Sequence, residues 1–447
     1  MRILVFHGYM LRGTGSNIYN VNLARALARL GHEVHLLCQD REARIEGVQI
    51  HNPDIGGLLP VYVKDPYEGF EVKTFPELSE AELDRYLEAN VAAVRDVAAH
   101  AGGIDLALAN HLVMGPAILA RAGVAPFAVK IHGSALEYTV KPHPRFLPYA
   151  REGLEAATGV LTGSGHTAAS LWAALSDLAD LREKTRLGPP GVDVEEFRAQ
   201  GEREPLVAFV GKLIVSKGVD LLLAAWPLVR AANPQVRLEV AGFGAYEEGL
   251  RRLQAVFDRG DLEDAREVAH RGWELEGGEE RPLPILSKFL ADPPQGYAES
   301  ARAAAGSVEF VGRLEHHEVA SMFPRAEAMV MPSTFPEAFG MVAVEAAACG
   351  TLPVSAGHSG MLEVSRQLSA ALAEPADRLV SFPVEQGAVE AIAERLNRWL
   401  ALPENQRDPA RRALVETVRR LWSWEGVARG VLAAAAGELD DLPRPGA

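Results

Sequence analysis

The chain has 447 residues, of which 48% are hydrophobic and 23% charged, a composition typical of a soluble enzyme with about two to three domains. The formal net charge of −15 argues against a nucleic-acid partner and does not favour contact with an anionic membrane. No apolar run is long enough for a transmembrane helix, and the N-terminus lacks a signal-peptide pattern. The two cysteines, Cys38 and Cys349, lie in apolar runs and are expected to be buried thiols, so a cytoplasmic protein is predicted.

The first half of the chain alternates short apolar runs with amphipathic segments. The predicted strands are residues 3–6, 34–37, 106–109, 127–131 and 160–162. Helices are predicted over 18–30 and, from the capping-box pair Ser79 and Glu82, up to about residue 101. Residues 40–76, rich in Gly, Pro and Tyr, are expected to be irregular. This rhythm predicts a parallel, doubly wound α/β sheet.

Residues 188–205 combine Pro, Gly and charged side chains and are expected to form a linker. The same alternation of strands and helices then begins again. The predicted strands are residues 206–210, 236–241, 308–311, 328–331 and 351–355, and a helix is predicted from about 219. An insert over 245–307 is expected to form helices and a loop, and 411–439 a helix. We therefore predict an N-terminal domain over 1–195, a C-terminal domain over 196–405, and a helical segment over 406–447.

One stretch, FPEAFGMVAVEAAACG at 335–350, carries two carboxylates eight residues apart, Glu337 and Glu345. The run of small apolar residues after Phe339 and Gly340 predicts a helix, placing Glu345 about two turns below its start. The free N–H groups near Phe339 to Val342 would attract an anion. The alternative is a buried Ala-rich helix with two solvated glutamates.

Three glycine-containing turns follow predicted strands and are candidates for binding phosphate. Lys212 and Lys217 lie in the turn that opens the second domain, although two solvated surface lysines are the simpler alternative. The loop 13–16 has neither a GxGxxG nor a GK[ST] pattern, so a plain tight turn is equally compatible. The glycines at 242 and 244 would allow a ligand or the facing domain to approach closely.

Two histidines follow predicted strands of the first domain, His111 and His132, with His7 as a weaker third. The carboxyl ends of strands face the ligand crevice of an open α/β sheet, which favours a polar substrate here over purely structural hydrogen bonding. No cluster has the spacing of a metal site, so we expect metal-free chemistry and no bound cofactor. A leaving diphosphate would then be stabilised by lysines and helix amides.

These motifs resemble the retaining glycosyltransferases of family GT4, with the GT-B fold. The resemblance is carried by Glu337 and Glu345 in PEAFGMVAVEAAACG, by VGKL…SKG, GFG and PPGVDVEEF, by His132-Gly133, and by the C-terminal WSWEGVARG. It spans nearly the whole chain and implies two Rossmann-like domains, doubly wound parallel sheets that face each other across a cleft. The last helical segment would cross back to the N-terminal domain.

The resemblance also implies roles for individual residues. Glu345 would bind the donor ribose, and Glu337 and His132 would lie beside the donor sugar, with Lys217 completing the catalytic group. The remaining donor-binding positions would be Gly15, Lys212, Gly242, Phe339, Gly340, Met341 and Val342. The acceptor would contact Ser16, Asn17 and His111. The family more often has Arg at the position of Lys212, so the geometry of phosphate binding is expected to differ.

The expected function is the transfer of a hexose from a nucleotide-diphosphate sugar to a hydroxyl acceptor, with retention at the anomeric carbon. The expected acceptor is a small soluble sugar, sugar phosphate or polyol. The alternatives are a sugar phosphorylase or synthase on the same fold and a non-catalytic protein that binds sugar nucleotides. An NAD-linked oxidoreductase is disfavoured by the missing glycine fingerprint.

Overall fold

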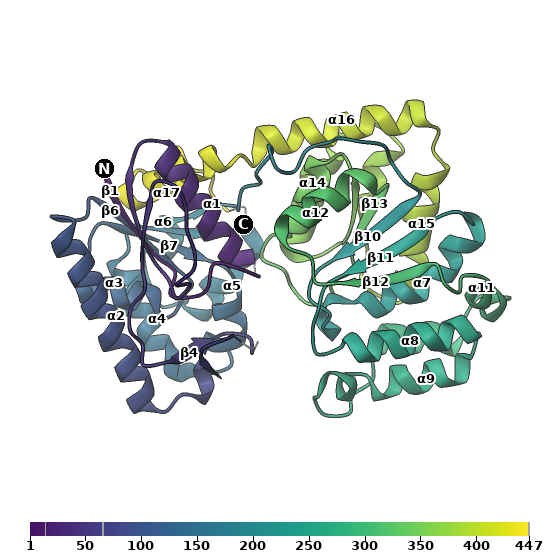
Figure 1. Cartoon of the computed structure of the whole chain (residues 1–447), viewed down its shortest axis with the longest axis horizontal. Helices are drawn as coiled ribbons and strands as arrows, with labels where there is room; N and C mark the ends of the chain where they lie inside the picture. Colours follow the sequence, from purple (N-terminus) through teal and green to yellow (C-terminus); the bar gives the residue numbers. More distant parts are fainter. Residues whose placement is uncertain (14, 65–66, 446–447) are drawn as a thin grey trace. The chain divides into compact units, whose positions relative to one another are not determined.

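The computed structural model describes residues 1–13, 15–64 and 67–445, which form two compact units (Figure 1). Unit 1 comprises Met1–Gly191 and Trp422–Ala447, and unit 2 comprises Val192–Leu421. The predicted boundary at 195/196 lies close to the first division. The predicted boundary at 405/406 falls inside the helix Glu404–Leu421, which belongs to unit 2, so the second division lies further along the chain.

Unit 1 is built on a seven-stranded parallel sheet in the order β3-β2-β1-β6-β7-β8-β9. Its strands are β1 (Arg2–Phe6), β2 (Glu33–Leu37), β3 (Val48–His51), β6 (Leu106–Asn110), β7 (Phe127–Ile131), β8 (Gly159–Thr162) and β9 (Thr185–Leu187). Each predicted strand is present. The chain order reverses between neighbours β1 and β6, which makes their carboxyl ends the expected binding crevice.

The prediction of an irregular region over 40–76 is wrong at three places. Strand β3 lies at the sheet edge, and β4 (Leu58–Val61) pairs in parallel with β5 (Glu71–Thr74). Strands β3 and β5 are four residues long and partly exposed, so they lack the apolar run that marks a buried strand. They form because sheet neighbours supply hydrogen bonds that local sequence does not reveal.

Helices cover both faces of the unit 1 sheet (Figure 1). The side chains of β1 alternate, so Ile3 and Val5 pack with α1 (Gly15–Arg29) and α17 (Trp424–Ala436). Leu4 and Phe6 face the opposite core, which contains residues of α2 (Glu80–His100), α3 (Gly115–Ala122) and α4 (Leu147–Ala156). The Ser79 capping box is confirmed at the start of α2. Helices α5 (Gly165–Ala174) and α6 (Leu181–Lys184) complete the unit.

Unit 2 contains a six-stranded parallel sheet in the order β12-β11-β10-β13-β14-β15. Its strands are β10 (Leu206–Val210), β11 (Arg237–Ala241), β12 (Val308–Gly312), β13 (Ala328–Met331), β14 (Leu352–Ala356) and β15 (Ser381–Phe382). The order reverses between β10 and β13, so the loops that follow these two strands meet at one edge of the sheet.

The helices of unit 2 include the predicted ones from about 219, in the insert and after Gly340, together with others that the sequence did not indicate. They are α7 (Val219–Ala232), α8 (Glu247–Arg259), α9 (Leu262–Arg271), α10 (Pro284–Ala291), α11 (Tyr297–Ala303), α12 (His316–Met322), α13 (Met341–Ala348), α14 (Ser359–Ser369), α15 (Ala388–Ala401) and α16 (Glu404–Leu421). The insert forms α8 to α11, as expected, and α11 packs against α7.

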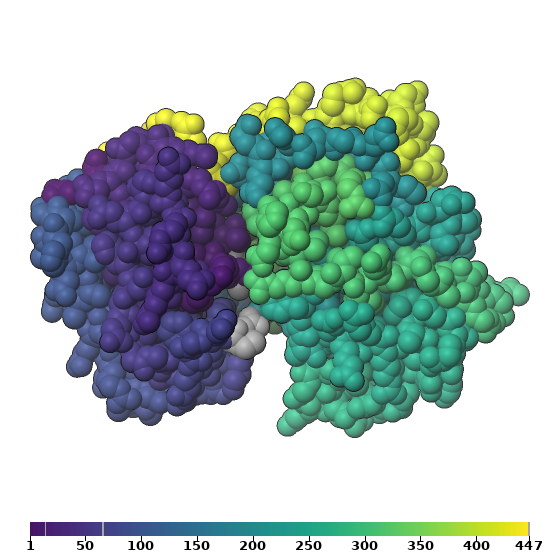
Figure 2. Space-filling view, in the orientation of Figure 1, coloured from purple at the N-terminus to yellow at the C-terminus, as the bar shows by residue number. Residues whose placement is uncertain are grey.

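The C-terminal region is two helices rather than the single helix predicted over 411–439. Helix α16 ends at Leu421, and Ser423 caps α17 by accepting a hydrogen bond from the backbone N of Gly426 at 3.4 Å. Figure 2 shows α16 on the surface of unit 2, next to the dark-teal segment 192–205. The two meet at Gly350, against which both Arg203 and Arg411 pack.

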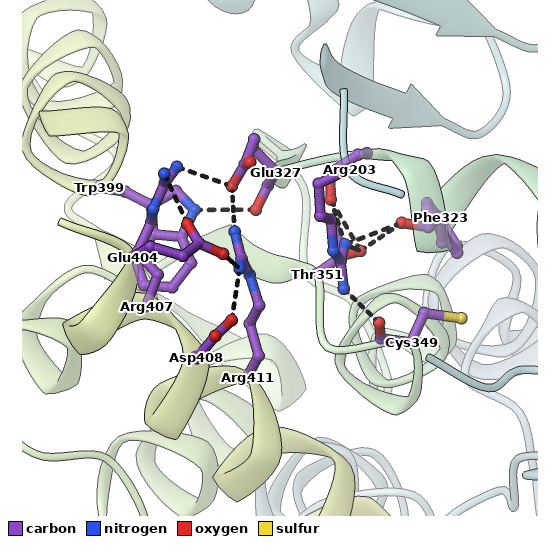
Figure 3. A network of polar contacts seen from close by, with 11 residues as sticks. Arg203, Phe323, Glu327, Cys349, Thr351, Trp399, Glu404, Arg407, Asp408 and Arg411 are labelled. Atoms are coloured by element: carbon purple, nitrogen blue, oxygen red, sulfur yellow. Dashed lines mark hydrogen bonds and ion pairs between the residues drawn. The ribbon is translucent and has the colours of Figure 1, made fainter. Parts of the chain in front are cut away.

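A buried charge network fixes α16 to the start of β13 (Figure 3). One carboxylate oxygen of Glu327 accepts from Arg411 at 2.7 Å and from Arg407 at 3.0 Å, and both Glu327 and Arg411 are 7% exposed. Arg411 also pairs with Glu404 and Asp408. Because the carboxylate compensates two guanidinium groups, removing it would take away their shared buried partner and leave only the more exposed Glu404 and Asp408.

A second cation, Arg203 in segment 192–205, holds the far end of α13 (Figure 3). Its guanidinium donates to the carbonyl oxygen of Cys349 at 2.6 Å and to the hydroxyl of Thr351 at 2.7 Å. A cation at a helix C-terminus also interacts favourably with the helix dipole. Segment 192–205 therefore fixes the position of the helix that carries Glu345.

We predict that Glu327→Ala lowers the free energy of unfolding by about 3–5 kcal/mol, because it removes the buried carboxylate that Arg411 and Arg407 share. Urea titration monitored by circular dichroism measures the change. The matched control is Glu394→Ala on α15, where an exposed carboxylate pairs with Arg395 and Arg398. The control is expected to change the free energy of unfolding by no more than about 1 kcal/mol. Equal losses in the two variants would contradict the importance of the network.

Candidate functional site

The candidate site of unit 2 lies where β10 and β13 end. Lys212 and the 3-10 turn η4 (Val215–Lys217) follow β10, and Glu337 follows β13. Because the two strands are parallel neighbours, their following loops lie together, and Thr334 N donates to Ser216 O at 2.9 Å. The predicted lysine turn and the predicted glutamate segment therefore meet in one place.

Two glycines allow this close backbone packing. Gly218 has φ +66°, and a Cβ atom there would overlap the carbonyl oxygen of Pro332. A Cβ atom at Gly242, a predicted donor contact, would overlap the carbonyl oxygen of Gly211. The structure thus uses Gly242 to bring the loop after β11 against the lysine loop.

Lys217 and Glu337 form an ion pair, with side chains 25% and 22% exposed. The same carboxylate oxygen accepts from the hydroxyl of Ser333 at 2.7 Å, and the backbone N of Glu337 donates to the hydroxyl of Ser359 at 2.9 Å. These contacts hold the carboxylate in a partly exposed position where a polar ligand can reach it. An ammonium group has three donors, so Lys217 can bind an anion while keeping Glu337.

The N-terminus of α13 lies directly after Glu337. Gly340 is the N-cap with φ +102°, and Phe339 before it is buried, whereas Met341 and Val342 are partly exposed. The first amides of a helix have no partner within it, and they carry the positive end of the helix dipole. The predicted anion-binding amides are therefore placed beside Lys217 and Glu337.

Glu345 is the fifth residue of α13, so it lies about one turn below the helix start rather than the predicted two. The shift arises because the helix begins at Met341, after Gly340. The carboxylate is 6% exposed, and one oxygen contacts Nε2 of His316 at 3.2 Å. The other ring nitrogen of His316 lies 3.3 Å from Glu196 in segment 192–205.

The two carboxylates, Glu196 and Glu345, keep His316 protonated. Burial lowers the pKa of His316, but the hydrogen bonds and negative charges of Glu196 and Glu345 outweigh burial and raise it to about 10. The imidazolium therefore compensates the buried charge of Glu345 and fixes one of its oxygens.

Sequence reasoning missed several residues that support this site. The sequence marked neither His316 nor the two serines, Ser333 and Ser359, as part of a site. Glu276 in η5 (Trp273–Glu276) of the insert accepts from the backbone N of Val215 at 3.0 Å, which connects the insert to the lysine loop. No local motif marks these contacts, because each joins residues of different elements.

The candidate site of unit 1 collects three histidines at the carboxyl ends of neighbouring strands. His7 directly follows β1, His111 directly follows β6, and His132 directly follows β7. The rings of His111 and His132 lie 4.7 Å apart between centroids, and those of His7 and His111 lie 5.7 Å apart. The predicted grouping of histidines is therefore present in the structure.

These histidines are neutral near pH 7. Burial lowers the pKa of His7 to about 4, and burial is also the main cause that lowers the pKa values of His111 and His132 well below their usual range. His111 is 2% exposed with φ +68°, and its ring nitrogens have no hydrogen-bond partner in the described part of the chain. Its contact with the acceptor stays a prediction.

The predicted phosphate loop of unit 1 leads into α1. Thr14 lies outside the described residues; Gly15 is exposed and Ser16 partly exposed at the helix start. Asn17 is 3% exposed, and its side chain bonds to His7 Nε2 at 2.9 Å and to the carbonyl oxygen of Arg12 at 2.5 Å. Both ends of the Asn17 amide are thus used inside the protein.

Among the described residues, no three His, Cys, Asp or Glu side chains form a group that could hold a metal ion. Cys38 and Cys349 are buried free thiols, as predicted. Over the same ranges, none of the helices combines the length and apolar character of a membrane-spanning segment.

Comparison with known proteins places this geometry in a family. Residues 13–196 match the model of Glycosyltransferase Family 4, and residues 298–415 match Glycosyl transferases group 1. The D-inositol 3-phosphate glycosyltransferase of Frankia alni is 30% identical over 83% of this chain and 86% of its own length. The chain belongs to glycosyltransferase family 4. It is therefore an enzyme, a glycosyltransferase, as predicted.

A further relative and two solved structures are also similar to this chain. The D-inositol 3-phosphate glycosyltransferase of Segniliparus rotundus is 27% identical over 94% of this chain and 84% of its own length. Anabaena HepE, solved with UDP-glucose, is 15% identical with a TM-score of 0.62 over 98% of this chain and 99% of its own. Sucrose-phosphate synthase from Thermosynechococcus elongatus is 21% identical with a TM-score of 0.60 over 96% of both chains. The GT-B fold is confirmed.

We predict that the stabilising effect of His316 depends on pH. Its folded pKa of about 10 lies above the ordinary value of 6.5, so its contribution is fully present below pH 6.5 and is lost as pH rises through 10. The difference in unfolding free energy between wild type and His316→Gln should shrink between these limits. Urea titrations at pH 6, 8 and 10 measure it.

The control is His317→Gln, which removes an exposed imidazole that neighbours His316 in sequence. This variant is expected to stay close to wild type at each pH. A His316→Gln difference that grows with pH would contradict the charged bridge.

Proposed function

We propose that this enzyme transfers a hexose from a nucleotide-diphosphate sugar, bound by unit 2, to a hydroxyl group of a small soluble acceptor. The observation that carries the proposal is the Lys217–Glu337 ion pair beside the N-terminus of α13. An ammonium group and free helix amides suit a diphosphate, and a partly exposed carboxylate suits sugar hydroxyls. A nucleotide-diphosphate sugar carries both of these groups.

Cleavage of the sugar–phosphate bond leaves negative charge on the diphosphate. Lys217, Lys212 and the amides at Phe339, Gly340, Met341 and Val342 would stabilise that charge, so the proposal requires no metal ion. Preorganised donors of this kind lower a barrier because they need no reorganisation as charge develops. Glu337 would orient the sugar hydroxyls while Lys217 holds the phosphate.

Glu345 would bind the ribose of the donor. His316 occupies one of its oxygens, which leaves the second carboxylate oxygen able to accept hydrogen bonds from a diol. A ribose diol would satisfy a carboxylate that is otherwise costly to bury. The donor base is left open because relatives are named for GDP-mannose and solved with UDP-glucose or ADP.

Unit 1 would contribute the acceptor side, with His132 beside the donor sugar and Gly15 near the phosphates. Ser16, Asn17 and His111 would be the acceptor contacts, and relatives named for an inositol phosphate support a sugar phosphate or polyol as acceptor. We propose retention at the anomeric carbon, by a front-face route in which the leaving phosphate assists deprotonation of the acceptor. Buried free thiols support the proposed cytoplasmic location.

Lys217→Ala is expected to lower kcat by about 10²–10³, because removing one preorganised donor costs about 2.7–4 kcal/mol. Proton NMR of reactions with UDP-glucose or GDP-mannose and inositol 3-phosphate, in EDTA, follows the rate and the anomeric configuration. The matched control is Lys288→Ala, an exposed lysine on α10. Similar rates for both variants would refute the site, and an inverted product would refute retention.

A further inference from the structure

The buried side chains around His132 form a hydrogen-bonded relay that runs across three strands of unit 1. It connects His132, Asn110, Asn20 and His7 and continues to Asn17. Asn20 and His7 are 0% and 1% exposed, and Asn110 is 1% exposed. A relay this well enclosed has defined donors and acceptors, which can be worked out from its fixed ends.

The carbonyl oxygen of Phe6 and the side chain of Asn20 set the orientation of the Asn110 amide. Its nitrogen donates to the carbonyl oxygen of Phe6 at 3.1 Å and to the side-chain oxygen of Asn20 at 2.7 Å. Both N–H groups are therefore used, and the amide oxygen faces Nε2 of His132 at 2.7 Å. That oxygen carries no proton, so Nε2 of His132 must carry one.

The donors and acceptors at the His7 end of the relay are also fixed. The nitrogen of Asn20 donates to the carbonyl oxygen of Ser16 at 2.8 Å, and its second N–H faces Nδ1 of His7 at 3.0 Å. His7 Nδ1 is then an acceptor, and its Nε2–H donates to Asn17 at 2.9 Å. No reversal of a single amide satisfies these contacts, because the carbonyl oxygens of Phe6 and Ser16 only accept.

The relay leaves Nδ1 of His132 available to a ligand. The neutral ring carries one proton, which the relay places on Nε2, so Nδ1 offers a lone pair. His132 is partly exposed, unlike the other members of the relay. It can therefore accept a hydrogen bond from a ligand hydroxyl, and it cannot donate one through Nδ1.

We propose that Asn110 and Asn20 are positioning residues that hold His132 in the neutral Nε2–H tautomer, so that Nδ1 serves as a hydrogen-bond acceptor for a sugar hydroxyl. The assignment to a sugar hydroxyl rests on the proposed function, whereas the tautomer itself does not. The relay selects for an uncharged hydroxyl at this point and against an anion, which would face a lone pair.

The test is a long-range proton–nitrogen correlation spectrum of the full chain labelled with ¹⁵N-histidine, recorded without ligand at pH 7. The spectrum of His132→Gln identifies the His132 signals. Wild-type His132 is expected to be neutral with its proton on Nε2. A proton on Nδ1, or on both nitrogens, would overturn the proposal whether or not the enzyme transfers sugar.

The role of Asn110 is tested by Asn110→Ala, with Asn90→Ala as the matched control. Asn90 is a buried asparagine of the same unit, on α2, whose side chain donates to the carbonyl oxygen of Tyr86. Asn110→Ala is expected to give mixed tautomers of His132 and a kcat/KM about tenfold lower. Asn90→Ala is expected to retain the wild-type His132 signals. An unchanged His132 tautomer in Asn110→Ala would overturn the positioning role.

Should Asn110→Ala fail to fold, Asn20→Ala provides the same measurement one step further along the relay. Its expected result is a second population of the Asn110 amide and hence of the His132 tautomer. A single Nε2–H form in that variant would overturn the role of Asn20, because the carbonyl oxygen of Phe6 would then orient Asn110 by itself. If the wild-type protein shows the Nε2–H tautomer of His132 but transfers no sugar, the proposed function is wrong and the tautomer assignment stands.

Discussion

The ion pair between Lys217 and Glu337 joins the loops that leave two neighbouring parallel strands of unit 2. Parallel strands end at the same edge of a sheet, so a cation after one and an anion after the other meet without long side chains reaching across the fold. Gly218 makes the approach possible, because any side chain there would overlap the backbone at Pro332. The N-terminus of α13 adds its amides at the same edge.

The two units offer opposite electrostatic environments to a ligand. Unit 2 combines lysines, helix amides and glutamates, with His316 kept charged between Glu196 and Glu345. Unit 1 presents histidines that burial keeps neutral, joined by asparagine amides. Anionic phosphate suits the first set and uncharged hydroxyl groups suit the second, which matches a donor with a diphosphate and an acceptor that reacts through a hydroxyl.

The sequence predicted the parts of the fold that local patterns determine. Buried parallel strands such as β10 and β13 are uninterrupted apolar runs, and Ser79 with Glu82 is a local capping pattern. The spacing of Glu337 and Glu345, with the lysine turn, identified the candidate site of unit 2. Strands β3 and β5 were missed because they are short, partly exposed and stabilised by neighbours.

Contacts between distant residues could not be predicted. Glu345 and His316 are 29 positions apart, and Asn20 and Asn110 are 90 apart, so no motif joins them. Their roles also depend on the surroundings of each ring, because two carboxylates raise the pKa of His316 whereas burial lowers the pKa of His132. Only side-chain geometry shows which nitrogen carries a proton and which carboxylate has a partner.

The central claim is that a nucleotide-diphosphate sugar binds to the Lys217, Glu337 and Glu345 site of unit 2. Thermal unfolding of the full chain with UDP-glucose, ADP-glucose and GDP-mannose, in wild type and in Glu345→Ala, tests it most directly. One of these donors, at 100 times its Kd, should stabilise the wild type by about 2.7 kcal/mol, and Glu345→Ala should lose most of that gain. Equal stabilisation of both proteins, or none in the wild type by any of the three donors, would contradict the account.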